Sequence, residues 1–173
     1  SGTDAVYARD MSKPVVVTID KALAEDLKKG LDDFRRKDAF EFRAFNATNA
    51  EFTRGDQKVS FERVKGQGEN ATDTWKRVSP SAADSDKSKV ESLLAGLADV
   101  RATAFTDSLA KTGLDKPVLT VFMKFDEGKK EERVSFGRNG SDAYALIRGQ
   151  PGAGKIEAEK LDEALKALDE LSK

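Results

Sequence analysis

The stretch Val59-Ser60-Phe61-Glu62-Arg63 occurs a second time in the chain as Val134-Ser135-Phe136-Gly137-Arg138. Further matches follow both stretches in the same order, and from Arg77 onward the matched residues stand 71 positions apart. They are Trp75-Lys76-Arg77 with Leu146-Ile147-Arg148, Pro80 with Pro151, and Val90, Leu93, Leu94, Leu97 and Val100 with Leu161, Ala164, Leu165, Leu168 and Leu171. The sequence therefore contains an internal duplication, with one copy over 59–100 and the other over 134–171.

Each copy has the pattern of three strands followed by one helix. The predicted strands are 51–53, 58–64 and 74–78 in the first copy and 118–125, 132–136 and 143–147 in the second. The first helix begins after Asp84 or Asp86 and the second covers 157–171. Burial of five apolar side chains would contribute roughly 8–15 kcal/mol, whereas ordering about fifteen residues costs ~1–2 kcal/mol per residue. Each helix must therefore pack on a sheet.

We predict the α+β class, with internally duplicated strand-strand-strand-helix units, antiparallel sheet or sheets, and helices packed on one face. The segments 80–85, 102–109 and 149–155 are interpreted as connections between these elements. The first repeat covers 39–104 and the second 105–173. The two repeats form one compact domain or two closely packed halves.

The opening of the chain, 1–38, resembles a partial third copy. Tyr7-Ala8, Pro14 and Ile19 match Tyr144-Ala145, Pro151 and Ile156 at a constant spacing of 137. This pattern predicts strands over 5–8 and 15–19 and then a helix capped by Asp20, with Leu23, Leu27, Leu31 and Phe34 along one face. Gly30 weakens this helix by about 1 kcal/mol relative to alanine, so we expect its end to fray or bend.

Composition excludes several kinds of chemistry. The 30 basic and 31 acidic residues nearly cancel, which argues against nucleic acid as a partner. The chain has no Cys and no His, so it lacks thiols, the commonest general base and the commonest transition-metal ligand. We therefore predict a protein that is not an enzyme, with no catalytic residue, no metal ligand and no cofactor. No apolar run reaches the ~20 residues that span a bilayer, but the start at Ser1-Gly2-Thr3 leads us to expect that an anchoring segment was removed.

One stretch imitates a phosphate-binding loop. Gly149-Gln150-Pro151-Gly152-Ala153-Gly154-Lys155 satisfies the first seven positions of that motif, but Ile156 stands where Ser or Thr must hold Mg²⁺. Only one helix follows, whereas the motif requires a parallel sheet and a later acidic strand end. We interpret the stretch as a strand-to-helix connection.

Three further motifs have plainer explanations. Ser108 to Gly113 contains S-x-x-K and K-T-G, but the two overlap at Lys111, whereas in penicillin-binding enzymes they are separate elements. Asp84-x-Asp86-x-Ser88 imitates a calcium loop without its glycine and its final glutamate, so helix capping is the better interpretation. Glycosylation triplets begin at Asn46, Asn70 and Asn139 and are expected to mark exposed loops.

Four loose motifs occur between about Val6 and Leu171. These are Val6-Tyr7-Ala8-Arg9, Phe34-Arg35-Arg36-Lys37, the block Trp75, Pro80, Ala83-Asp84, Val90, Leu93-Leu94, Leu97, Val100, and the turn Gly113-Leu114-Asp115-Lys116-Pro117. In these motifs the chain resembles a bacterial family, domain of unknown function 4340 (DUF4340). Thr112 stands before this turn where the family favours Tyr.

The resemblance implies a domain that follows a membrane helix, lies on the extracytoplasmic side of a bacterial membrane, and is encoded beside transporter subunits similar to those of gliding-motility systems. It implies no reaction and no catalytic residue. The leading hypothesis is thus a non-enzymatic binding or scaffolding domain that contacts an envelope protein through a sheet edge or the groove between the halves. The alternative is a small-ligand-binding or hydrolytic domain that uses the cleft between the halves, with carboxylates or Lys155 as working groups. A spacer role is a third possibility.

Overall fold

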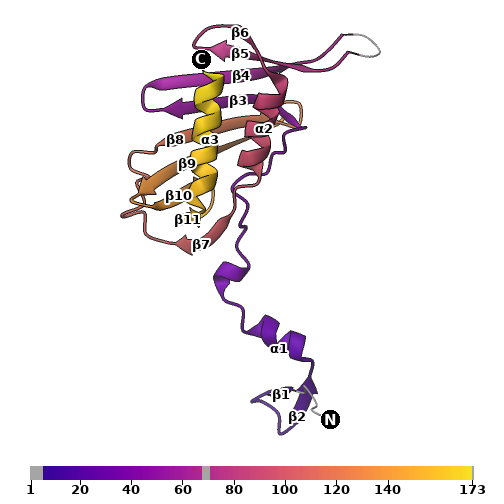
Figure 1. Cartoon of the computed structure of the whole chain (residues 1–173). Helices are drawn as coiled ribbons and strands as arrows, with labels where there is room; N and C mark the ends of the chain where they lie inside the picture. Colours follow the sequence, from indigo (N-terminus) through magenta and orange to yellow (C-terminus); the bar gives the residue numbers. More distant parts are fainter. Residues whose placement is uncertain (1–5, 68–70, 173) are drawn as a thin grey trace. The chain divides into compact units, whose positions relative to one another are not determined.

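The computed structural model describes residues 6–67 and 71–172. The chain divides into two compact units, residues 1–36 and 37–173 (Figure 1). Each unit has its own sheet, and each is described by itself below. No helix among the described residues is both long and apolar enough to cross a membrane.

The larger unit is built on one antiparallel sheet. Its nine strands, counted over the described residues, lie in the order β6-β5-β4-β3-β8-β9-β10-β11-β7. They are β3 (Ala47–Arg54), β4 (Gln57–Val64), β5 (Thr74–Ser79), β6 (Ala83–Ser85), β7 (Ala102–Thr106), β8 (Leu119–Phe125), β9 (Lys130–Asn139), β10 (Asp142–Ile147) and β11 (Ala153–Ile156). Two helices, α2 (Lys87–Ala98) and α3 (Ala158–Leu171), lie side by side over one face (Figure 1). The predicted α+β class is confirmed.

The duplication is visible in the order of the strands. β3 pairs with β8 at the middle of the sheet, and β4-β5-β6 on one side mirror β9-β10-β11 on the other. Each set of four strands is followed by a helix, and α3 begins at Ala158, 71 residues after α2 begins at Lys87. The two repeats thus form one continuous sheet around an approximate two-fold axis.

The sequence missed three short strands. β6 and β11 lie in segments that we interpreted as connections, and β7 lies in the segment predicted to join the halves. β6 and β11 have three and four residues, too few to show an alternating pattern. Each repeat therefore has four strands before its helix. β7 follows the first repeat in the chain but pairs with β11 of the second.

The repeated apolar residues form the core. Phe61 and Phe136, the matched residues of β4 and β9, are both fully buried. The helix positions Val90, Leu93, Leu94, Leu97, Leu161, Ala164 and Leu168 are also buried, and Leu165 and Leu171 pack against the core while partly exposed. Trp75 does not correspond structurally to Leu146, because Trp75 pairs with Arg63 and Ser85, and the residue that pairs with the matching Arg138 and Ile156 is Ala143, which is also buried.

The smaller unit is a hairpin followed by a short helix. β1 (Val6–Arg9) pairs with β2 (Val16–Ile19), α1 covers Lys21–Leu27, and a 3₁₀ turn, η1, covers Leu31–Asp33. Asp20 caps α1 as predicted, because its carboxylate accepts a hydrogen bond of 2.7 Å from the Ala22 amide. The strand predicted from Ala5 begins outside the described residues.

The prediction of a longer amphipathic first helix was wrong. The α-helix ends at Leu27, and the predicted apolar face, Leu23, Leu27, Leu31 and Phe34, is exposed. Within this unit, Ala24 alone among the described large and small apolar side chains is buried. Gly30 disfavours continuation of the helix, and a two-stranded sheet is too small to bury a whole helix face.

Gly137 on β9 gives a direct test of the packing. A β-carbon at this position would lie 2.4 Å from the carbonyl oxygen of Thr112 and 2.7 Å from backbone atoms of Gly113 and Leu114. We expect Gly137→Ala to lower the free energy of unfolding by about 1–3 kcal/mol, because backbone must move to make room. Urea denaturation followed by Trp75 fluorescence measures the change.

The matched control for Gly137→Ala is Gly96→Ala in α2, where a new methyl group meets nothing within 4 Å. This substitution should raise the free energy of unfolding by up to about 1 kcal/mol, because alanine is the better helix former. Equal stabilities of the two variants would contradict the close approach of the 112–114 turn to β9.

Candidate functional site

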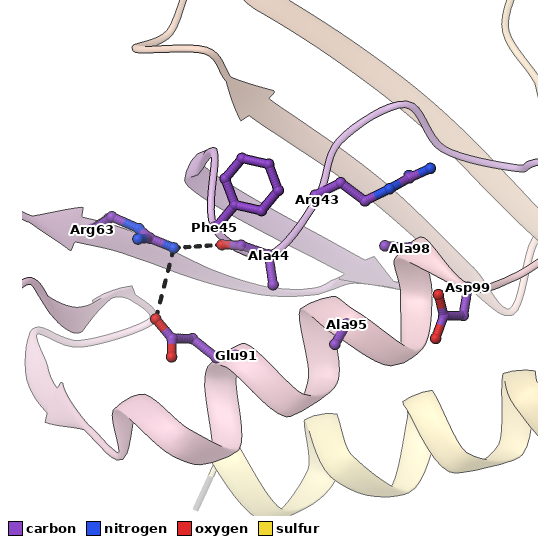
Figure 2. Close-up of a pocket in the computed structure, with 8 residues that line it drawn as sticks. All are labelled: Arg43, Ala44, Phe45, Arg63, Glu91, Ala95, Ala98 and Asp99. Carbon is purple, nitrogen blue, oxygen red and sulfur yellow. Dashed lines mark hydrogen bonds and ion pairs between the residues drawn. The ribbon is translucent and has the colours of Figure 1, made fainter.

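A pocket of about 430 Å³ opens beside α2, between the turn that precedes β3 and the end of β4 (Figure 2). This volume lies within the ~300–1,000 Å³ typical of ligand sites. Its lining residues are Arg43, Ala44, Phe45, Arg63, Glu91, Ala95, Ala98 and Asp99. The alanines supply an apolar surface, and the arginines and carboxylates supply charges of both signs.

Arg63 is the residue that organises the pocket. Its guanidinium lies 4.9 Å from the centre of the Trp75 ring and donates a hydrogen bond to the carbonyl of Ala44. Glu91 on α2 lies 3.8 Å away and Asp73 3.7 Å away. The side chain is only 12% exposed, so these contacts are shielded from water more than a surface ion pair is. Arg63 thus ties the 43–45 turn, β5 and α2 together; Figure 2 shows its contacts with Ala44 and Glu91.

The turn that carries Phe45 is held at several points. The side-chain oxygen of Asn46 accepts a hydrogen bond of 2.8 Å from the Arg43 amide, and its amide group donates one of 2.9 Å to Asp126. Just before the turn, the carboxylate of Glu132 accepts hydrogen bonds from the amides of Glu41 and Phe42 at 2.8 and 2.9 Å. The turn is therefore fixed on both sides. Asn46 begins a triplet that was expected to mark an exposed loop; it lies in this turn and is half-buried.

Phe45 stands out from this rigid turn into solvent. It is 78% exposed, whereas Phe40 and Phe42, on the same segment, are buried in the core. The Arg43 guanidinium donates a hydrogen bond of 2.8 Å to the carbonyl of Phe42. This bond holds the Arg43 side chain near the pocket. An exposed aromatic ring next to two arginines is an arrangement typical of binding surfaces.

The second repeat has a counterpart of the Arg63–Glu91 pair. Arg138 matches Arg63 in the repeated pentapeptide, and Asp162 stands 71 residues after Glu91. Arg138 forms a charge-assisted hydrogen bond with Asp162. Sequence reasoning did not single out either pair, although an arginine and an acid that recur at the repeat spacing are a signal that could have found them.

The stretch that imitates a phosphate-binding loop has a structural role. Its last residues belong to β11, and Gly152 has φ of +68°. A β-carbon at Gly152 would lie 2.0 Å from the carbonyl oxygen of Thr106 on β7. The glycine there is therefore required by the close approach of β7, and β11 occupies the place where the phosphate motif needs a loop.

Lys155, the working group of the alternative hypothesis, is paired. Its ammonium group lies 2.8 Å from Asp142 on β10. The hydrogen bond to Asp142 raises the pKa of Lys155 above its ordinary value of 10.5. A lysine that acts as a general base or nucleophile needs a lowered pKa, so this environment favours the opposite protonation state.

The residues of the other motifs also have local structural roles. Thr112 is buried and its hydroxyl donates a hydrogen bond of 2.6 Å to the carbonyl of Leu109, which closes a turn. Of the two predicted caps, Asp84 and Asp86, it is Asp86 that caps α2, by accepting a hydrogen bond of 3.2 Å from the Lys89 amide. Among the described residues, no group of three or more Asp, Glu, His or Cys side chains is placed to hold a metal ion. Asn70 lies outside the described residues.

The groove between the two halves is small. It lies between α2 and α3, has a volume of about 150 Å³, and is lined by Ser92, Leu93, Gly96, Lys160, Glu163, Ala164 and Ala167. This volume is below the ~300 Å³ at which ligand sites begin. The pocket at Arg63 is the larger of the two and lies within the first repeat.

The fold and the pocket together define a duplicated α+β domain with a candidate binding site on its first repeat. Comparison of the sequence with known families identifies the group. Two overlapping regions, residues 1–117 and 75–172, match the family described as Domain of unknown function (DUF4340), so the chain belongs to that family. The two matches are consistent with the internal repeat, and the predicted family is confirmed. Neither the curated proteins nor the solved structures contain a match.

The matched pairs Arg63–Glu91 and Arg138–Asp162 allow a comparison within one chain. Arg63→Ala removes a hydrogen bond to a carbonyl and the contact with Trp75 from a buried setting. We expect it to lower the free energy of unfolding by about 1.5–3 kcal/mol. Arg138→Ala removes a pair whose acid is 60% exposed, which should cost less than about 1 kcal/mol. Denaturant unfolding of both variants measures the difference, and equal losses would contradict the organising role of Arg63.

Proposed function

We propose that this protein is a non-enzymatic binding or scaffolding domain of a membrane-tethered bacterial envelope protein, and that it contacts a partner protein through Phe45 and the adjoining pocket. The observation that carries the proposal is the exposure of Phe45 on a turn that Arg63 and Asn46 hold rigid. Aromatic and arginine side chains dominate the binding energy of protein interfaces. A rigid turn also loses little conformational entropy when it binds.

The charges of the pocket support a polypeptide as the occupant. Arg43 and Arg63 are matched by Glu91 and Asp99 on the opposite wall. These carboxylates would repel the negative charges of a phosphate or a nucleic acid, whereas a protein surface carries both signs of charge. The alanine floor and Phe45 would receive an apolar side chain of the partner.

The envelope location, the membrane tether and the transporter-associated partner are supported by the resemblance to the bacterial family that the sequence motifs indicated. A small-ligand site is the second candidate, and the volume of the pocket, about 430 Å³, favours it. In that case the ligand would occupy the pocket at Arg63 rather than the groove between the halves.

A photo-crosslinking amino acid placed at position 45 tests the proposal in the anchored full-length protein. We expect a discrete crosslinked protein from position 45, because the side chain would lie inside the interface. The matched control is position 109, where Leu109 is also exposed, at 48%, but lies away from the pocket-forming residues in the sequence. No adduct from position 45, or the same adducts from both positions, would contradict the proposal.

A thermal-shift screen of nucleotides, sugars and divalent ions separates the two candidates. A small ligand present at 100 times its dissociation constant would raise the free energy of unfolding by about 2.7 kcal/mol. A stabilising compound whose effect is lost in Arg63→Ala would favour the small-ligand site.

A further inference from the structure

The residues around the pocket at Arg63 lie in two rows of opposite charge. One row follows β4 and the turn before β3, and the other follows α2 (Figure 2). In the same direction, the first row consists of Arg63, Phe45 and Arg43, and the second of Glu91, Ala95 and Asp99. Each basic residue of the first row thus has an acidic residue beside it in the second, and the aromatic ring has an alanine.

The two charges at one end of the rows, Arg43 and Asp99, have no ionic partner in the described part of the chain. Both side chains are exposed, and the Arg43 guanidinium donates its hydrogen bond to a neutral acceptor, the carbonyl of Phe42. At the other end of the rows, Arg63 and Glu91 already lie 3.8 Å apart. Arg43 and Asp99 are therefore the charges that a partner can pair.

Asp99 stands at an unfavourable place for an acid. It is the C-cap residue of α2, and the last turn of this helix has no basic residue. The carbonyl groups at this end carry partial negative charge, which favours a cation. The same end of α3 receives cations from two strands. Arg54 of β3 lies 2.5 Å from Asp169. Arg77 of β5 donates a hydrogen bond of 3.4 Å to the carbonyl of Leu171.

The pocket is large enough for an aromatic ring like the one that stands beside it. Its volume is about 430 Å³, whereas a cavity of ~150 Å³ already accommodates benzene. Ala44, Ala95 and Ala98 supply apolar surface between the charged ends. Phe45 is 78% exposed and leaves the pocket of its own chain open. The same surface therefore carries both an apolar side chain that protrudes and a space that would accept one.

We propose that the pocket is occupied by a second copy of this chain, in a symmetric dimer whose two-fold axis runs parallel to α2. This inference rests on the proposed function, since it names the partner that contacts Phe45 and the pocket. A two-fold axis in this direction exchanges the two rows, and an interface of this symmetry must be self-complementary. Arg43 then lies against Asp99 of the second copy, and Phe45 enters the second copy's pocket beside Ala95. Each contact occurs twice, and each α2 receives a cation at its C-terminal end.

Charge reversal in two separate variants tests this pairing. Sedimentation equilibrium of the full chain should show a monomer and a dimer. Arg43→Glu and Asp99→Arg should each weaken the dimer by roughly tenfold or more, because like charges then face each other twice. An equimolar mixture of the two variants should restore the dimer, since each variant then meets the opposite charge on the other.

Two results of this experiment would overturn the proposal. One is a mixture that associates no more tightly than either variant alone. The other is a chain that stays monomeric at every concentration up to ~1 mM. Lys166→Glu, at an exposed position of α3, is the matched charge control and should leave the dissociation constant of the dimer unchanged.

Phe45→Ser separates association from folding. Because Phe45 is 78% exposed in the free chain, the substitution should leave the melting temperature of the dilute monomer unchanged. It should weaken the dimer by roughly tenfold or more, because an aromatic ring is lost from the interface. A dimer of unchanged strength in Phe45→Ser would place the interface elsewhere and overturn the proposal.

The photo-crosslinking amino acid at position 45 distinguishes this inference from the proposed function. An adduct between two copies of the chain would support the dimer. An adduct with a different protein would overturn the dimer and leave the proposed function standing. An adduct formed within one chain would show that another part of the same chain covers the pocket. That result, like the absence of any adduct, would overturn both.

Discussion

The antiparallel pairing of β3 with β8 is the interaction on which the larger unit depends. It places Ala50 opposite Met123 and Phe52 opposite Val121, and all four side chains are buried. Without this pairing the sheet would divide into one of four strands and one of five, each with an unpaired edge strand. β7 links the two repeats a second time. It follows α2 of the first repeat in the chain, but it pairs with β11 of the second repeat at the edge of the sheet.

The two repeats share a frame but differ at the residue before the matched arginine, which in the first repeat lines the pocket. Glu62 in the first repeat stands where the second has Gly137. The absence of a side chain at Gly137 lets the 112–114 turn approach β9 closely. Glu62 does not permit the same approach, and the 43–45 turn is held instead by the Arg63 guanidinium beside the pocket. Duplication followed by divergence thus accounts for a candidate site on the first repeat only. Arg138 of the second repeat is the residue with which Arg63 can be compared.

Much of the fold could be predicted from the sequence, because long strands, tight turns and the apolar faces of helices leave recognisable patterns in it. The Asn139-Gly140 hairpin, the capping by Asp86 and the buried face of α2 were all visible in this way. The strands β6 and β11 were not, because three and four residues are too few to show an alternating pattern. β7 was not, because it pairs with β11, which lies beyond the other strands of the second repeat in the chain. The pocket also escaped prediction, since Phe45 shows no pattern in the sequence and its role depends on the tertiary contacts of Arg63. The first helix was wrongly extended because its apolar spacing continues past Leu27, although these side chains are exposed in the structure.

Native-state hydrogen exchange at the central strand pair tests this account most directly. If β3 and β8 join the repeats into one cooperative unit, their amides at Ala50, Phe52, Val121 and Met123 should exchange only through global unfolding, with one common opening free energy. Amides of residues 6–34 should exchange with much lower opening free energies, because that unit has almost no core of its own. Markedly different opening free energies for β3 and β8 would show that the halves open independently and would contradict the account.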